Sequence, residues 1–444
     1  MTTSFKHRHW APAAIAALAF SGWAGLAAAA GDAGLASAPA RWVGTWAAAP
    51  QPAFPGPPAR YDDRTLRLIV HTSLGGARVR IRVSNTYGRT PLHVGAAHLA
   101  LRRGGTEIDA ATDRALRFAG RPDVVIAPGA TVVSDAVDLA VPALADLAVS
   151  LHLSGRAAAT TVHALAQATG YVVRGDATGA ARLPTAQPID AWPFLTGVDV
   201  ASADGATAAA VVVFGDSWVD GDGSTPDANA RWPDALAAAL QRAGGACARV
   251  AVLNEGLIGN RLLHGSPVRH GPGAPDFGAA LGASGLARFD RDVLGQAGVR
   301  AVIVHLGTND IGFEGGVAPA GETVTAAALI AGYRELIARA HRAGLQAIGS
   351  TLTPVEGVTL LPNYDTKAKD ALREQVNAWI RGSGEFDAVV DLDRALRDPA
   401  HPARLAAAFA SPDHLHANDA GYAAAAAALP LASLCEASRT AAPG

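Results

Sequence analysis

The order of apolar and polar residues divides the chain into two parts with different periods. In residues 78–83, valine and isoleucine alternate strictly with arginine, which is typical of a strand with one apolar and one wet face. Further short strand-like runs, separated by Pro, Gly and Asp, lie at residues 66–70, 124–126, 132–133, 147–153 and 171–173. The pattern predicts an antiparallel β-sandwich or jelly-roll-like accessory domain over residues 41–174. We expect its arginine face to be solvated rather than to bind an anionic ligand.

The second part begins with a continuous apolar run at residues 209–214, which is typical of a strand buried on both faces of a parallel sheet. Residues 232–243 have a helical pattern, with Pro233 near the start and a glycine pair at the end. Further strand-like runs lie at residues 250–253, 302–306, 347–352 and 389–392, and further helical runs lie at 326–343, 367–380 and 420–429. This alternation predicts an α/β domain over residues 208–435, with an open parallel sheet and helices on both faces.

Two segments have the composition of connections. Residues 175–207 contain three prolines and many small residues, so we expect a linker between the two domains. The Gly- and Pro-rich residues 265–285 form an expected insertion between the second and third strands of the parallel sheet, where they could act as a flap beside the site.

The first thirty residues resemble a targeting segment. Lys6 and Arg8 precede a mostly apolar run over residues 11–30, which closes on three alanines. This is the pattern of a cleaved signal peptide, although the run is nearly long enough to be a membrane anchor instead. The small residues at its end favour cleavage. We therefore expect a secreted or periplasmic protein with no stable membrane insertion after cleavage.

Composition excludes some classes of partner and cofactor. The chain is 50% hydrophobic and has a formal net charge of −2 with no long run of one sign, so we expect neither disorder nor nucleic-acid binding. Its two cysteines, Cys247 and Cys435, lack the spacing of a metal site. Asp220, Asp222 and Asp227 faintly resemble a calcium loop but lack its twelfth-position Glu. We expect a solvated loop there, and no metal.

Polar residues follow the predicted strands, at the edge where ligands of open parallel sheets bind. Ester hydrolysis requires a nucleophile, a base, a group that orients the base, and donors for the oxyanion. Ser217 follows the first strand and can be the nucleophile, while His416 can be the base and Asp413 can orient it. The amides of Ser217 and Gly259 and the side chain of Asn309 can supply the oxyanion hole.

Four blocks in this part of the chain resemble those of the SGNH or GDSL hydrolase superfamily. The blocks are Gly-Asp-Ser at 215–217, Asn to Gly at 254–259, Gly-x-Asn-Asp at 307–310 and Asp-x-x-His at 413–416. The resemblance spans roughly residues 209 to 430. It implies a flavodoxin-like sheet, a triad and three oxyanion donors formed by the residues named above, and no cofactor. Asp216 and Asp310, which lie within the blocks, are expected to support the site.

The whole chain is also similar to a secreted bacterial branch of that superfamily, with an N-terminal β domain and an association with arylesterases and acylhydrolases. The segments that carry this similarity are Trp-Val-Gly-Thr-Trp at 42–46 and Val-Ser-Asn at 83–85. His414 is the main competitor of His416, but the Asp-x-x-His spacing selects His416. For His305 we expect a packing role at the end of a strand.

The flavodoxin-like strand order 2-1-3-4-5 implies that the first and last helices share one face of the sheet, with their C-terminal ends side by side. Cys247 follows the first of these helices and Cys435 follows the last. In an exported protein this placement predicts a disulfide, and the alternative is two separate buried thiols.

These features predict a secreted serine esterase that acts on small-molecule or polysaccharide esters. Candidate substrates are O-acyl or O-acetyl groups of polysaccharides and aryl or short-chain esters. Two alternatives stay open: an O-acyltransferase that passes the acyl group to a carbohydrate, and a carbohydrate-binding protein whose hydrolase domain is inert.

Overall fold

The computed structural model describes residues 41–201, 208–267, 276–319, 321–361 and 363–437. The predicted signal peptide over residues 1–30 lies outside the described residues, as does the middle of the predicted flap. By its internal contacts, the chain from Ala40 onward groups into one unit. None of the helices in the described ranges combines the length and the apolar character that crossing a membrane requires.

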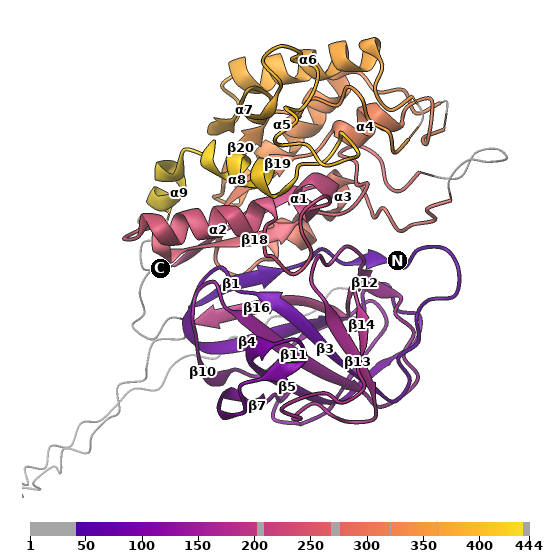
Figure 1. Cartoon of the computed structure of the whole chain (residues 1–444), viewed down its shortest axis with the longest axis vertical. Helices are drawn as coiled ribbons and strands as arrows, with labels where there is room; N and C mark the ends of the chain where they lie inside the picture. The colour runs from indigo at the N-terminus through magenta and orange to yellow at the C-terminus, as the bar shows by residue number, and fades with distance from the viewer. Residues whose placement is uncertain (1–40, 202–207, 268–275, 320, 362, 438–444) are drawn as a thin grey trace, which may run out of the picture. The chain divides into compact units, whose positions relative to one another are not determined.

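The first half of the described chain consists of antiparallel strands in three sheets, as Figure 1 shows. One sheet has the order β1-β16-β4-β10 with β9 paired to β4, and its strands are β1 (Trp42–Ala47), β4 (Gly76–Ser84), β9 (Thr131–Val133), β10 (Val137–Val141) and β16 (Leu195–Ala201). The largest sheet contains β3 (Arg64–His71), β5 (Leu92–Gly104), β6 (Glu107–Ile108), β7 (Arg114–Ala115), β8 (Val124–Ile126), β11 (Asp146–Leu153), β13 (Gly170–Arg174) and β14 (Gln187–Ile189). The smallest contains β2 (Gln51–Pro52), β12 (Thr161–His163) and β15 (Trp192–Pro193). The predicted antiparallel β architecture is confirmed.

The expectation of a linker over residues 175–207 is wrong for its second half. β14, β15 and β16 lie within that range, and β16 pairs with both β1 and β4. Pro188 and Pro193 suggested a connection, but they lie in β14 and β15, each of which pairs with a single neighbour. Proline is tolerated in such edge strands because its missing N–H is not needed there. The β half therefore extends to Ala201.

We expected the arginine face of β4 to be solvated, but Arg80 and Arg82 are partly buried. Asp199 on the neighbouring strand β16 is opposite Arg80 in register, and its carboxylate accepts hydrogen bonds from Arg80 at 2.9 Å and Arg82 at 3.2 Å. Arg82 also donates to Gln296 of the second half at 3.1 Å. The face is therefore an internal contact between the two halves of the chain. Only Arg78 is exposed.

The second half is built on a five-stranded parallel sheet of order β18-β17-β19-β20-β21, which is the predicted order 2-1-3-4-5. Its strands are β17 (Ala209–Gly215), β18 (Val250–Glu255), β19 (Val299–His305), β20 (Gln346–Ser350) and β21 (Ala388–Val390). The helices are α1 (Ser217–Asp220), α2 (Trp232–Ala243), α3 (Gly285–Phe289), α4 (Thr308–Phe313), α5 (Ala326–Arg342), α6 (Lys367–Gly382), α7 (Leu392–Leu396), α8 (Asp419–Ala427) and α9 (Leu431–Ala437). The predicted fold class is confirmed.

Hydrophobic packing covers both faces of this sheet. Alternate residues of β17 pack in opposite directions, since Val211 and Val213 join one core with α2 and α8. Val212 and Phe214 join a second core with α3, α5 and α6, and this core continues into the sheets of the β half. All residues of β17 are buried, which explains its continuous apolar run.

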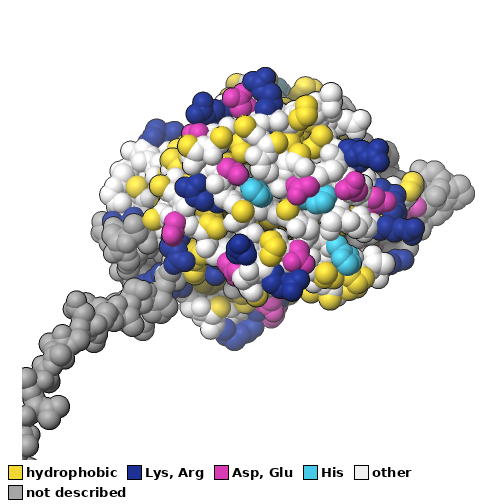
Figure 2. Space-filling view, turned by 90° about the horizontal axis from the view of Figure 1, so that it is seen from below, with side chains coloured by type: hydrophobic (Ala, Val, Ile, Leu, Met, Phe, Trp, Pro, Cys, Tyr) yellow, Lys and Arg dark blue, Asp and Glu magenta, His cyan; other side chains and the backbone are white. Residues whose placement is uncertain are grey.

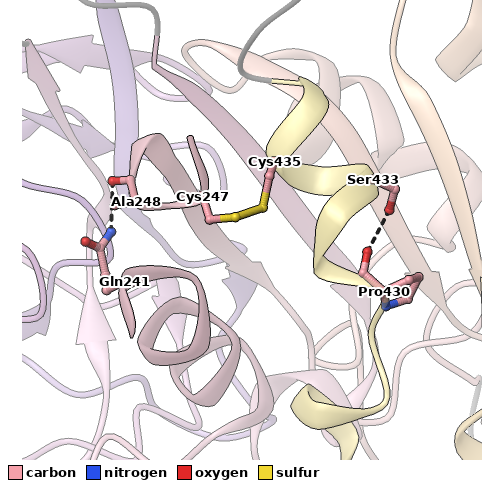
Figure 3. Close-up of a disulfide and its surroundings, with 6 residues drawn as sticks. All are labelled: Gln241, Cys247, Ala248, Pro430, Ser433 and Cys435. Atoms are coloured by element: carbon pink, nitrogen blue, oxygen red, sulfur yellow. Dashed lines mark hydrogen bonds between the residues drawn. A yellow bond between two sulfur atoms is a disulfide. The ribbon is translucent and has the colours of Figure 1, made fainter. Parts of the chain in front are cut away.

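The structure contains the predicted disulfide between Cys247 and Cys435 (Figure 3). Cys247 begins a short 3₁₀ turn after α2, as expected. Cys435 lies within α9, a helix that the sequence analysis did not anticipate after α8. The bridge joins two segments that are 188 residues apart in sequence.

On the face of the molecule seen in Figure 2, Lys and Arg side chains are interspersed with Asp and Glu side chains. This mixture agrees with a chain that has 37 basic and 39 acidic residues and no long run of either sign.

Candidate active site

Ser217 is the first residue of α1, two positions after the end of β17, at the carboxyl edge of the parallel sheet. Asp216 caps α1 because its Oδ1 accepts a hydrogen bond from the Trp218 amide at 3.0 Å. The turn leaves no room for a side chain at Gly215, where a Cβ would lie 2.7 Å from the carbonyl oxygen of His305. The predicted role of Asp216 as a hydrogen-bonding scaffold fits this geometry.

A continuous hydrogen-bond chain joins Ser217, His416 and Asp413. The Ser217 Oγ lies 2.8 Å from His416 Nε2, and His416 Nδ1 lies 2.6 Å from Asp413 Oδ2. The other carboxylate oxygen of Asp413 accepts bonds from Ser411 Oγ and from the amides of Leu415 and His416. The loop thus folds back on itself, and the spacing of three residues lets Asp413 hold the ring of His416.

The pKa shifts of Asp413 and His416 suit a role of His416 as general base. Burial raises the pKa of Asp413, but hydrogen bonds from His416 and Ser411 outweigh it and hold the pKa well below its usual value. Burial lowers the pKa of His416, whereas the hydrogen bond to Asp413 and the charge of Asp222 raise it, so its pKa lies above the usual value. With Asp413 ionised, Nδ1 of His416 donates to it, and Nε2 is left to accept the hydroxyl proton of Ser217.

The expected oxyanion donors face the same cavity as Ser217 and His416. Gly259 has a φ of 66°, in the left-handed region that favours glycine, and a Cβ there would lie 2.8 Å from the side chain of Leu281. Asn309 donates from Nδ2 to the Asn260 carbonyl at 3.1 Å, and its Oδ1 accepts a bond from Tyr364 at 2.8 Å. These contacts fix the orientation of the side-chain amide. The structure brings the donors together, and their catalytic roles stay predictions.

The cavity has a volume of about 280 Å³ and is mostly apolar. Its polar lining comprises Ser217, Asp222, Gly259, Asn309, Tyr364 and His416, and its apolar lining comprises Phe54, Ile258, Phe277, Leu281, Phe313, Leu360, Leu361 and Leu415. Phe277 and Leu281 belong to the predicted flap, of which residues 268–275 lie outside the described part. Phe54 comes from the β half, so both halves of the chain line the cavity.

Asp310, for which a supporting role is predicted, does not line the cavity. Its carboxylate accepts hydrogen bonds from the amides of Leu262 at 2.6 Å and Leu263 at 2.9 Å. Burial raises its pKa to about 6, and burial likewise raises the pKa of Asp216 to about 7. Asp310 thereby holds the loop after β18 against the start of α4.

The two competing histidines behave as the sequence indicated. His414 has a positive φ of 60° and an exposed side chain, and it does not line the cavity. His305 is fully buried, hydrogen-bonds to Ser350 at 3.1 Å and packs against Trp218 and Trp232. Burial lowers the pKa of His305 to about 3, so it stays neutral in the core.

The interpretation of Asp220, Asp222 and Asp227 as a solvated loop is wrong for Asp220, which is buried, but holds for Asp227, which is exposed. Asp220 is fully buried beside His163 of the β half, at 2.8 Å. Asp222 lies 3.8 Å from His416 Nε2, and Asp227 accepts two hydrogen bonds from Thr169. The loop packs against strands that are distant in sequence, which no local pattern reveals. Among the described residues, no group of three or more His, Cys, Asp or Glu could hold a metal ion.

Several residues of the site were not found from the sequence. Tyr364 and Phe54 belong to no motif, and Asp222 was interpreted only as part of a solvated loop, so only the folded chain brings these residues to the cavity. The Asp222 carboxylate could have been suspected from its position five residues after the nucleophile, within the loop that follows it.

Residues 213–424 match the model of the GDSL-like Lipase/Acylhydrolase family. This half of the chain is therefore a GDSL-like lipase/acylhydrolase domain, and the protein is a carboxylic ester hydrolase. None of the curated proteins compared with the chain matches it.

Several solved structures are similar to part of the chain. The M. smegmatis aryl esterase is 16% identical, with 52% of this chain and 99% of that chain covered and a TM-score of 0.37. LAE5, an alpha/beta hydrolase from the metagenome of Lake Arreo, Spain, is 24% identical, with 52% and 97% covered and a TM-score of 0.36. Est24, a carbohydrate acetylesterase from Sinorhizobium meliloti, is 14% identical, with 51% and 99% covered and a TM-score of 0.36.

Proposed function

We propose that this protein is an exported serine esterase that hydrolyses carboxylic esters through an acyl-enzyme on Ser217. The observation that carries the proposal is the hydrogen-bond chain from Ser217 through His416 to Asp413, which opens into a mostly apolar cavity. A serine whose hydroxyl bonds to a carboxylate-oriented imidazole is the recurring arrangement of an activated nucleophile.

The proposed reaction has two halves. His416 Nε2 takes the proton of Ser217 as Oγ attacks the ester carbonyl, and the amides of Ser217 and Gly259 with Asn309 Nδ2 stabilise the oxyanion. His416 then gives this proton to the leaving alkoxide, and the alcohol departs from the acyl-enzyme. Water, deprotonated by His416, attacks the acyl carbon. As this second tetrahedral intermediate collapses, His416 returns the proton to Ser217 Oγ, and the acid is released.

The cavity supports a substrate class. Its apolar side chains and its volume of about 280 Å³ suit a short acyl chain or an aryl group rather than a long lipid tail. We propose aryl and short-chain esters as substrates. An O-acyl group of a polysaccharide would use the same cavity for its acyl chain while the sugar stays outside.

Replacement of the nucleophile tests this proposal. Ser217→Ala should lower hydrolysis of a chromogenic acetyl or butyryl ester by roughly 10⁴- to 10⁶-fold, since the covalent intermediate cannot form. A fluorophosphonate should label the wild type once per chain, on Ser217, and should not label the variant. Ser224→Ala is the matched control, because Ser224 is also buried but donates only to the Gly221 carbonyl. A Ser217→Ala variant that keeps a sizeable share of wild-type activity would exclude the assignment.

A further inference from the structure

The β half contributes a buried histidine to the loop that follows the nucleophile. His163, at the end of β12, lies 2.8 Å from Asp220, the last residue of α1. The side chains are 3% and 0% exposed, so this is the most deeply buried His–Asp pair among the described residues. Asp220 lies three positions after Ser217, yet the proposed mechanism assigns nothing to either member of the His163–Asp220 pair.

The hydrogen-bond partners of His163 determine its charge. Its Nδ1 lies 2.9 Å from the Ala49 carbonyl, and its Nε2 lies 3.2 Å from the Leu165 carbonyl as well as near Asp220. Carbonyl and carboxylate oxygens accept hydrogen bonds, and a ring that carries a proton on both nitrogens satisfies all three contacts. His163 is therefore an imidazolium that faces the Asp220 carboxylate.

Electrostatics agree with this assignment. Burial lowers the pKa of His163, but the charge of Asp220 and the hydrogen bond to it raise the pKa above its usual value. Arg231 is the other charged group that acts on the ring, and it lowers the pKa. Trp192 packs beside the ring, with centroids 5.4 Å apart, and helps to exclude water.

The second carboxylate oxygen of Asp220 accepts a hydrogen bond from the loop that follows β18 and contains Gly259. Oδ2 accepts a hydrogen bond from the Ile258 amide at 3.0 Å, and the next residue is Gly259. The loop also packs directly on α1, because a Cβ at Gly256 would lie 2.1 Å from the Asp220 backbone nitrogen. Asp220 thus joins the helix that begins with the nucleophile to the loop that presents the Gly259 amide.

We propose that His163 and Asp220 are positioning residues, which set the distance between Ser217 and the Gly259 amide by holding Ile258. The proposal rests on the proposed function, since it concerns the oxyanion hole of the same site. It gives the β half a part in catalysis: the half supplies the cation that fixes the Asp220 carboxylate.

The test compares Asp220→Asn and His163→Gln with the wild type on a chromogenic short-chain ester. Misplacement of one oxyanion donor should lower kcat by about 10- to 100-fold while KM changes by less than about twofold. Rates are expressed per site titrated with a fluorophosphonate, so partial misfolding does not change kcat. The double variant should lose no more than the worse single variant, because the two residues act as one unit.

His98→Gln is the matched control. His98 forms a half-buried pair with Asp113 at 2.9 Å in the same β half, outside the catalytic cavity, so its loss should leave kcat unchanged. Unchanged kcat in both test variants, an effect confined to KM, or an equal loss in His98→Gln would overturn the inference. Ser217→Ala is measured alongside: if it is active, the proposed function fails, whereas an inactive Ser217→Ala beside fully active Asp220→Asn overturns only the positioning role.

Discussion

Removal of the disulfide between Cys247 and Cys435 should destabilise the protein without lowering its activity at 25 °C. The bridge closes a loop with a sequence separation of 188 residues. In the chain-entropy model, a loop of this length restricts the unfolded chain by about 5 kcal/mol at 25 °C. An unfolding entropy of about 2.1 cal/mol/K per residue over roughly 400 residues converts this into a Tm lower by about 6 °C.

The assay is calorimetric unfolding of a Cys247→Ala/Cys435→Ala double variant beside the wild type. Wild type incubated with a reductant should approach the Tm of the variant, since both lack the same covalent link. Specific activity at 25 °C should be unchanged, because the bridge joins the C-terminal end of α2 to α9, whereas the cavity lies at the carboxyl edge of the sheet. Two free thiols in the denatured, unreduced wild type would refute the reasoning, as would equal Tm values.

Three further predictions concern the site. His416→Ala should lower activity as far as Ser217→Ala does, whereas His414→Ala should have little effect, and the reverse ranking in an ester-hydrolysis assay would contradict the assignment. Asn309→Ala should lower kcat by roughly 10²- to 10³-fold, as loss of one oxyanion donor does, and a change seen only in KM would argue against that role. Because the imidazole must be neutral to accept a proton and the pKa of His416 is raised, kcat/KM should fall on the acid side with a midpoint above 6.5. In Asp413→Asn this midpoint should move to lower pH while the rate falls by about 10⁴-fold, and a wild-type midpoint below 6.5 would exclude the assumed electrostatics.

Local patterns predicted the secondary structure best where residues that start or stop an element, such as proline and glycine, agree with the pattern of burial. The helix expected at residues 232–243 is α2 with the same bounds, because proline at its first turn and glycine after its end act locally. The apolar run of β17 is likewise recognisable as a central strand from the sequence, because burial on both faces of the sheet leaves no alternation of polar and apolar residues. β16 was missed because the prolines before it resembled a linker, although its residues pair with two strands that lie far away in sequence.

The sequence by itself determined the chemistry of the candidate site: Ser217, Asp413 and His416 lie in short blocks that follow predicted strands, and the common edge of a parallel sheet then brings the blocks together. Only the tertiary structure decided which groups surround them. The contacts of His163 with Asp220 and the place of Phe54 in the cavity depend on how the β half packs against the α/β half. Such contacts follow from burial and charge between segments far apart in the chain, so no spacing or period in the sequence records them.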